Sequence, residues 1–177
     1  MDQQIVDFFF SLRTDIGLQL FSFITSFASP IESISLMILS FYLIGYQKNK
    51  KRILVGALGF LGVEAITAIL KVLVHRARPD VLMQAIHETS FSFPSGHATS
   101  AAFVFGYFGY MLLKKYPHQT KRVWVIFFVT LAVVLIDVSR LYLGVHYLSD
   151  VLVGNLIGLL GLFVTIRVGE RLDTRKT

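Results

Sequence analysis

Long apolar stretches alternate with short polar connections along this chain. A helix of about 20 residues crosses the hydrocarbon core of a bilayer, and five stretches approach or reach that length. They are residues 31–46, 53–73, 99–113, 124–140 and 147–166. The first and third are short, so we expect them to extend into their flanks. The pattern predicts an all-α fold: a polytopic membrane helical bundle with about five transmembrane helices.

The first 29 residues follow a different pattern. Asp7, Arg13 and Asp15 interrupt an otherwise apolar, Phe-rich run, and a Ser-Pro step ends it. An amphipathic helix lying in the membrane interface suits this composition; a sixth, poorly hydrophobic crossing is the alternative. Neither an internal repeat nor a linker is visible. We therefore expect a single domain over 1–177, with an interfacial N-terminal helix over 1–29 and a transmembrane core over 30–177.

The composition also indicates a membrane protein. Of the 177 residues, 54% are hydrophobic and only 16% are charged, against about 25% charged in a typical soluble domain. The mean hydropathy is +0.65. So much apolar surface cannot be hidden inside a soluble globule of this size. The absence of cysteine excludes disulfides, thiolate metal ligands and a cysteine nucleophile.

The basic residues predict the orientation of the chain. The formal net charge is +6, and twelve of the 17 Lys and Arg residues lie in three clusters within 48–52, 114–122 and 167–176. These clusters follow every second predicted span, so the positive-inside rule places all three in the cytoplasm. The remaining connections then face outward from the cytoplasmic membrane. Clustering between spans also argues against nucleic acid as a partner.

One outward connection carries two cations in the run from Lys71 to Pro79. Lys71 and Arg78 are seven residues apart, so on a continuous helix they project from the same face. Pro79 ends the helix just beyond them. Two cations on one face would bind an anion, although a pair of basic side chains reaching for the interface is the alternative.

A second polar segment, Ser-Phe-Pro-Ser-Gly-His over 92–97, leads into the third span. Ser95 is well placed as a helix N-cap, and Gly96 lets backbone amides approach a ligand closely. Free amides at a helix N-terminus bind phosphate readily. His97 would lie in the first turn, beside that ligand. The alternative is an ordinary cap followed by an incidental histidine.

The third polar segment, over 139–150, contains Arg140, His146 and Asp150. His146 and Asp150 are four residues apart, so a helix places them on one face. An acid beside an imidazole fixes its tautomer and raises its basicity, as nucleophilic and general-base sites require; a structural His–Asp pair is the alternative. Ionisable residues at membrane depth are costly and usually functional. Three such segments on one side of the membrane predict an active site.

These segments resemble the signature of the type 2 phosphatidic acid phosphatase superfamily, in its membrane lipid-phosphatase branch. The family pattern is Lys-x6-Arg-Pro, then Pro-Ser-Gly-His, then Ser-Arg-x5-His-x3-Asp, and this chain matches every position of it. The superfamily also contains bacterial acid phosphatases and vanadium haloperoxidases. Its membrane members commonly have six spans, so the five predicted here are a departure at the start of the chain.

The resemblance implies a role for each matched residue. His146 is expected to attack phosphorus and form a phosphohistidine, with Asp150 orienting it. His97 is expected to act as the general acid and then to assist the attacking water. The expected ligands of the phosphoryl oxygens are Lys71, Arg78, Ser95, Gly96 and Arg140. Because cations neutralise the phosphate, neither a metal nor another cofactor is expected.

Three acids beside the motifs need an interpretation. Glu64 and Asp137 would each orient a cation or form a buried structural pair. Glu88 lies in the 80–93 connection, which is expected to cover the site or touch the head group. The motif residues would recognise a phosphate group rather than a lipid tail. The candidate substrates therefore remain phosphatidylglycerophosphate, phosphatidic acid, undecaprenyl pyrophosphate and lipid A. The alternatives in function are a vanadium-dependent haloperoxidase and a non-catalytic lipid transporter.

Overall fold

The computed structural model describes residues 1–43, 50–116 and 119–174, and all regular structure in these ranges is helical. The elements are α1 (Asp2–Ser11), α2 (Asp15–Ser26), α3 (Pro30–Leu43), α4 (Lys50–Val74), a short 3-10 helix (Val81–Met83), α5 (Gly96–Lys115), α6 (Gln119–Tyr142) and α7 (Leu148–Thr174). The predicted all-α class is therefore confirmed.

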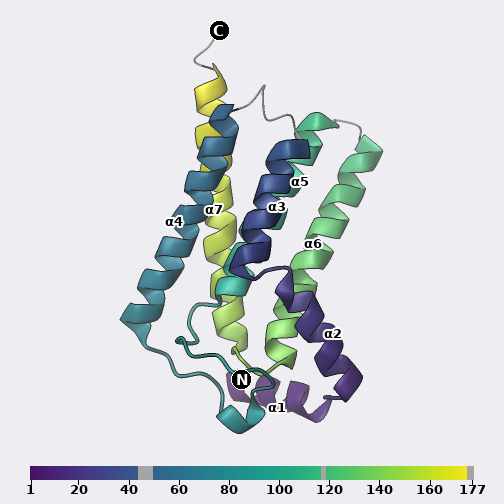
Figure 1. Cartoon of the computed structure of the whole chain (residues 1–177), viewed down its shortest axis with the longest axis vertical. Coiled ribbons are helices and arrows are strands. Elements are labelled where there is room, and N and C mark those ends of the chain that lie inside the picture. The colour runs from purple at the N-terminus through teal and green to yellow at the C-terminus, as the bar shows by residue number, and fades with distance from the viewer. Residues whose placement is uncertain (44–49, 117–118, 175–177) are drawn as a thin grey trace.

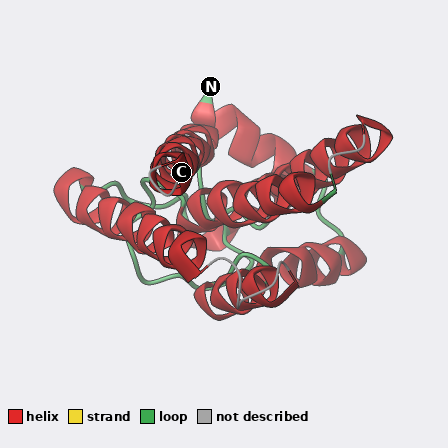
Figure 2. Ribbon diagram, turned by 90° about the horizontal axis from the view of Figure 1, so that it is seen from above, coloured by secondary structure: helices red, strands yellow, loops and turns green. Residues whose placement is uncertain are grey.

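The helix α5 forms the centre of the bundle and packs against α3, α4, α6 and α7. Figure 1 shows these helices running along a common direction, and Figure 2 shows the bundle from one end. Gly154 and Gly158 allow α7 to approach α5 closely. A Cβ atom at Gly154 would lie 2.6 Å from the carbonyl oxygen of Ser95, and one at Gly158 2.5 Å from that of Thr99. Small residues four apart permit this kind of contact between membrane helices.

Among the described helices, three are long and apolar enough to cross a membrane: α4, α6 and α7, over Lys51–Val74, Arg122–Tyr142 and Leu148–Leu172. A fourth crossing is formed if α2 and α3, which meet at a bend of 50°, are counted together. The remaining predicted span, α5, begins with Gly-His-Ala-Thr-Ser and has most of its side chains buried by its neighbours. A helix enclosed by other helices does not need to be apolar on all sides.

Residues 1–29, where the sequence predicted one interfacial helix, contain two helices joined by a turn. The first, α1, lies across one end of the bundle, and α2 runs along α6 (Figure 1). Arg13, in the turn, donates from Nε to the carbonyl oxygen of Tyr142 at 2.8 Å. Thr14 caps α2 by accepting from the amide of Gly17. The N-terminal segment is therefore attached to the end of α6 by specific contacts.

The two ends of the bundle differ in charge. The described parts of the three basic clusters lie where α4 and α6 begin and where α5 and α7 end, and Figure 1 shows these termini together at the top. Residues 48–49, 117–118 and 175–176 of the clusters lie outside the described ranges. At the opposite end, the connections 75–95 and 143–147 meet α1. All three polar segments identified in the sequence therefore gather at one end.

Candidate active site

His146 lies at the centre of this end of the bundle, in the turn between α6 and α7. Only 1% of the surface of His146 is exposed. The turn depends on Gly144, which has a φ of 68°, a conformation that glycine adopts without steric cost. A Cβ atom at this position would lie 2.1 Å from the carbonyl oxygen of Met83. The turn that carries the imidazole therefore packs against the 80–93 connection.

The Nδ1 atom of His146 faces Asp150, in the first turn of α7. The Nδ1–Oδ2 distance is 3.5 Å. The same carboxylate oxygen accepts from the hydroxyl of Ser92 at 2.5 Å and from the amide of Tyr147 at 2.9 Å. Because a carboxylate only accepts, this arrangement assigns the imidazole proton to Nδ1. The predicted His–Asp pair is present, although His146 precedes the helix that carries its partner.

The Nε2 atom of His146 faces the guanidinium group of Arg78 at 3.3 Å. A guanidinium only donates, so Nε2 presents its lone pair. Burial lowers the pKa of His146 to about 4, the charges of Arg140 and Arg78 add to this, and Asp150 opposes it. The imidazole is therefore neutral near pH 7. A neutral imidazole with its proton on Nδ1 has a nucleophilic nitrogen on the side of the cations.

Arg78 is not on the helix that carries Lys71. The helix α4 ends at Val74, and His75 has a φ of 51°, so the expected shared helix face is absent. Instead the chain turns, and Arg78 donates to the carbonyl oxygens of Ser90 at 2.8 Å and Val145 at 2.7 Å. Its position therefore depends on two connections that are far apart in the sequence.

Lys71 nonetheless faces the same site from the end of α4. Its Nζ atom donates to the carbonyl oxygen of Phe91 at 2.5 Å, and its charge interacts with those of Arg78 and Arg140. The prediction that these cations lie together is correct, but its geometric reason was wrong. A loop, rather than the repeat of a helix, brings Arg78 to Lys71.

Arg140 is the most deeply buried of the cations, with 1% of the residue exposed. One of its terminal nitrogens donates to the hydroxyl of Thr25 at 3.1 Å, and the other to the carboxylate of Glu88 at 2.7 Å. Its Nε atom is buried and has no hydrogen-bond partner. A buried guanidinium with one unsatisfied nitrogen retains the capacity to bind a further oxygen atom.

The carboxylate of Glu88 lies between two of the cations that were expected to bind phosphate. In addition to its contact with Arg140, it approaches Arg78 at 3.6 Å. Burial alone would raise the pKa of Glu88, but the hydrogen bond and charge of Arg140, together with the charge of Arg78, lower it. The 80–93 connection therefore covers the site, as predicted, and supplies an anion to it.

The start of α5 contributes the remaining predicted residues. Ser95 is the N-cap, accepting from the amide of Ala98 at 3.5 Å, and its own amide donates to the carbonyl oxygen of Asp150 at 3.0 Å. Gly96 opens the helix with free space around it: an added Cβ atom would meet only Thr67, at 4.0 Å. His97 follows in the first turn, close enough to Arg140, Glu88 and His146 to interact with them electrostatically.

Besides Glu88, three residues to which the sequence assigned no role lie at this site: Ser92, Arg76 and Asp2. Ser92 contacts Asp150, and Glu88 contacts Arg140, as described above. Arg76 donates to Asp150 at 2.6 Å and to Asp2 at 2.8 Å. Ser92 and Arg76 are close to motif residues in the sequence, whereas nothing local to Asp2 indicates a role, because its partners lie more than 70 residues away.

The two other candidate acids have structural partners. Asp137 accepts from the side-chain amide of Asn155 at 2.6 Å, so it pairs with α7 rather than with Arg140. Glu64 accepts from the hydroxyl of Ser100 at 2.6 Å. Among residues 1–43, 50–116 and 119–174, no group of three or more His, Asp or Glu side chains is arranged to hold a metal ion.

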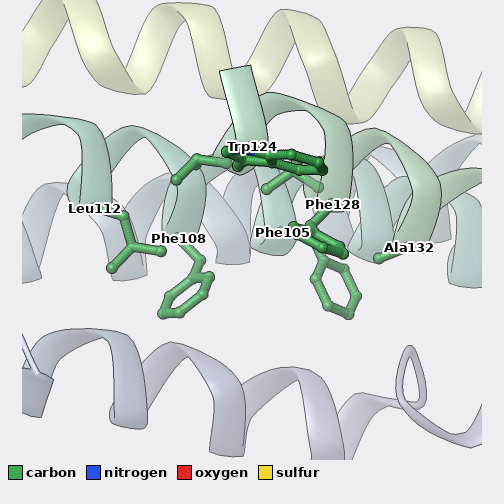
Figure 3. Close-up of a pocket in the computed structure, with 8 residues that line it drawn as sticks. Phe105, Phe108, Leu112, Trp124, Phe128 and Ala132 are labelled. Carbon is green, nitrogen blue, oxygen red and sulfur yellow. The ribbon is translucent and has the colours of Figure 1, made fainter. Parts of the chain in front are cut away.

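A separate cavity of about 480 Å³ lies between α5 and α6. Figure 3 shows side chains of both helices around it. Its lining consists of Phe105, Phe108, Leu112, Trp124, Val125, Phe128, Val129 and Ala132. No lining side chain is titratable, and α5 enters this region only after two turns beyond His97. The cavity is therefore apolar and distinct from the polar site.

The fold and the site define a multi-pass helical membrane protein with a buried histidine, surrounded by arginine and carboxylate side chains, at one end of its bundle. Residues 50–173 match the family model of the PAP2 superfamily. The match covers most of the chain and includes all three polar segments. This chain belongs to the PAP2 superfamily, and the resemblance inferred from the motifs is confirmed.

Two curated relatives are named as phosphatases. Phosphatidylglycerophosphatase B of Bacillus subtilis (strain 168) is 39% identical over 108 residues, which cover 60% of this chain and 53% of the relative. The aligned part thus spans about half of that relative. Decaprenylphosphoryl-5-phosphoribose phosphatase of Mycobacterium tuberculosis is 34% identical over 143 residues, which cover 75% of this chain and 71% of the relative.

Two solved structures share the fold. The crystal structure described as the first transmembrane PAP2 type phosphatidylglycerolphosphate phosphatase from Bacillus subtilis aligns with a TM-score of 0.88 and 30% identity, covering 96% of this chain and 85% of that one. Aquifex aeolicus LpxE aligns with a TM-score of 0.75 and 20% identity, covering 94% of each chain. At that identity the second match supports the fold alone.

Proposed function

We propose that this protein is a lipid phosphate phosphatase that hydrolyses a phosphomonoester or pyrophosphate through a phosphohistidine at His146. One observation carries the proposal: the buried imidazole has Nδ1 facing the Asp150 carboxylate and Nε2 facing the guanidinium group of Arg78. That geometry gives a nucleophilic nitrogen beside groups that bind phosphoryl oxygens. The family match and the names of the relatives support the same activity.

In the first step, the substrate phosphate replaces the Glu88 carboxylate between Arg78 and Arg140. The Nε2 atom of His146 then forms a bond to phosphorus as the bond from phosphorus to the leaving oxygen breaks. His97 supplies a proton to that oxygen, and Asp150 stabilises the positive charge that develops on the imidazole. The cations bind the equatorial oxygens, which carry most of the charge in a loose phosphoryl-transfer transition state.

In the second step, water attacks the phosphohistidine while His97 accepts its proton. The bond from phosphorus to Nε2 breaks, which releases inorganic phosphate and restores the neutral imidazole. The covalent intermediate divides one difficult displacement into two easier ones. We propose that the reaction needs no metal, because Lys71, Arg78 and Arg140 supply positive charge that metal ions supply in other phosphoryl-transfer enzymes.

The proposed substrate is a lipid whose phosphate reaches the membrane interface. The site lies at one end of the bundle, beside an N-terminal segment with exposed apolar side chains such as Phe8, Leu12 and Ile16. The name of the Bacillus relative supports phosphatidylglycerophosphate as the first candidate to test, and the name of the Mycobacterium relative supports adding a polyprenyl-linked sugar phosphate. Phosphatidic acid, undecaprenyl pyrophosphate and lipid A complete the set to be compared.

Phosphate release from this set of lipids tests the activity. Protein purified in detergent should release phosphate in the presence of EDTA, and His146→Ala should lower kcat by more than about 10,000-fold, as loss of a covalent nucleophile does elsewhere. The exposed Arg167, at the opposite end of the bundle, offers Arg167→Gln as a matched control that retains activity. Full activity in His146→Ala, or a strict requirement for a divalent ion, would contradict the proposal.

We further propose that the protein resides in the cytoplasmic membrane with its site on the outer side. The basic clusters at the other end of the bundle support this orientation. Because the chain contains no cysteine, single cysteines can be introduced at Leu82, which is 84% exposed near the site, and at Lys114. An impermeant thiol reagent added to intact cells should label Leu82→Cys and leave Lys114→Cys unlabelled. The opposite result would reverse the orientation.

A further inference from the structure

Arg76 connects the N-terminal segment to the carboxylate that faces His146. One terminal nitrogen of its guanidinium group donates to Oδ1 of Asp150 at 2.6 Å and to the hydroxyl of Ser149 at 2.6 Å. The other donates to Oδ2 of Asp2 at 2.8 Å. The guanidinium also lies over the ring of Tyr147, 4.2 Å from its centroid. Arg76 is thus held in place from several sides.

The two oxygens of Asp150 have different partners. Oδ2 accepts from Ser92 and from the amide of Tyr147 and faces Nδ1 of His146. Oδ1 accepts from Arg76. A carboxylate can rotate about its terminal bond, and a contact on the second oxygen restricts this rotation. Arg76 therefore determines the plane of the carboxylate and the direction in which Oδ2 points.

Asp2, the first residue of α1, holds Arg76 from the other side. Its carboxylate also accepts from the amide of Ser149 at 3.2 Å and from the Ser149 hydroxyl at 2.5 Å. Burial alone would raise the pKa of Asp2, but its hydrogen bonds with Ser149 and Arg76 lower it. Asp2 is therefore ionised at neutral pH. Its charge balances that of Arg76, so the guanidinium does not neutralise Asp150 alone.

We propose that Arg76 is a positioning residue that aligns the Asp150 carboxylate with His146, and that Asp2 holds Arg76 in that position. The proposal rests on the proposed function, because it assigns Arg76 a part in preparing the nucleophile. It also gives α1 a role in catalysis, because Asp2 of this helix holds Arg76, which in turn holds Asp150. Among the described interactions, no hydrogen bond joins Arg76 to Lys71, Arg78 or Arg140, so we expect its effect on the reaction step rather than on phosphate binding.

Kinetics of Arg76→Gln distinguish positioning from binding. Partners that orient a reacting side chain typically contribute about 10- to 100-fold to activity. We expect kcat to fall by about that factor, while KM and the inhibition constant of vanadate, a phosphate mimic, stay within about twofold. Arg76→Lys retains a cation and should recover part of the lost kcat. Unfolding temperatures in detergent, measured for each variant, report whether the fold is intact.

A double-mutant cycle tests the connection through Asp2. Asp2→Asn should lower kcat by a smaller factor than Arg76→Gln. Because Asp2 acts through Arg76, it should have no further effect in the Arg76→Gln background. Asp7→Asn is the matched control: Asp7 lies on the same helix, is exposed, and accepts only from Gln3 among the described contacts. It should leave kcat unchanged.

His146→Ala, measured alongside, separates this proposal from the proposed function. If His146→Ala is inactive while Arg76→Gln keeps its kcat, the positioning role is overturned and the phosphatase mechanism stands. If Arg76→Gln loses vanadate binding, the proposal also fails. It fails too if Arg76→Lys recovers no kcat and both variants unfold at a lower temperature than the unsubstituted protein, because the role of Arg76 is then structural. An active His146→Ala would instead overturn the proposed function.

Discussion

The two sides of His146 are built from the same chemistry but differ in how firmly they are held. On the Nδ1 side, the guanidinium of Arg76 pairs with Asp150 and Asp2, both in first turns of helices. On the Nε2 side, the guanidinium groups of Arg78 and Arg140 pair with Glu88, which lies in a connection. The Asp150 side chain is fully buried, whereas the Asp2 and Arg76 side chains are each 30% exposed and that of Glu88 is 27% exposed, so the main difference is that helices carry the first two carboxylates and a connection carries the third.

In the proposed mechanism, this difference follows from what each side has to do. The Nδ1 side would keep the imidazole in one tautomer throughout the reaction, and fixed partners serve that purpose. The Nε2 side would accept a phosphate and release it, so its resident carboxylate would have to be replaceable. A buried cation without an anion would be costly. Glu88 compensates the charge of the arginines when no phosphate is bound.

Among changes to the two sides of His146, the largest effect is expected from removal of a cation on the phosphate side. Arg140→Gln should lower kcat/KM by about 100- to 1,000-fold, as loss of one group that stabilises transition-state charge does in other enzymes. Phosphate release in detergent measures it, with the exposed Arg167→Gln as the control. A loss below tenfold would show that Arg140 serves only to hold Glu88.

The protonation of His146 depends on both sides together. Arg78 and Arg140 oppose its protonation and Asp150 favours it, with Arg76, Ser92, Lys71 and His97 close by. Because the pKa of His146 is lowered to about 4, about 30-fold more of the imidazole should be neutral at pH 5 than for an ordinary histidine of pKa 6.5. NMR of ¹⁵N-labelled histidine, with the signal assigned by its loss in His146→Ala, measures this midpoint.

The sign of the effect on stability follows from the same shift. Below pH 6.5 the unfolded chain binds a proton at His146 that the folded protein does not bind. Stability should therefore fall as the pH decreases from about 6.5 to about 4, with no further contribution from this residue below pH 4. His146→Ala should remove this contribution from the pH dependence of unfolding. An NMR midpoint near 6.5 would contradict both expectations.

On the fixed side, a smaller effect is expected from Ser92→Ala. This change removes a hydrogen bond to the same oxygen of Asp150 that faces His146, while Arg76 and the amide of Tyr147 still hold the carboxylate. We expect kcat to fall about 10-fold with little change in KM. Single-turnover formation of the phosphohistidine measures the step directly. An increase in KM alone would place Ser92 on the phosphate side.

The smallest effect, a gain of a few-fold, is expected from Glu88→Gln. The amide keeps the shape of the side chain but loses the charge that competes with phosphate for Arg78 and Arg140. Vanadate and inorganic phosphate should therefore inhibit the variant at a few-fold lower concentration. Thr89→Ala, at the exposed neighbouring position, is the control. Unchanged or weaker inhibition would show that Glu88 does not compete with the anion.

The sequence indicated the chemistry of the site more completely than its geometry. Motif residues and their spacing identified His146, Asp150 and the cations, because charged residues at the ends of apolar stretches are informative in themselves. The geometric argument for Lys71 and Arg78 failed, since a turn at His75 ends the helix between them. Hydropathy correctly indicated α4, α6 and α7 but described α5 less well, because enclosure by other helices replaces the need for apolar side chains.

By itself, the sequence determined that the chain is helical and apolar, and it predicted the three segments that the structure brings together at one end of the bundle. These properties depend on residue type and local spacing. Only the tertiary structure decided that Asp2 reaches Arg76, that Thr25 reaches Arg140, and that Glu88 lies between two arginines. Such contacts join segments more than 50 residues apart or depend on the path of a loop. No local pattern records them, because folding alone brings these groups within hydrogen-bonding distance.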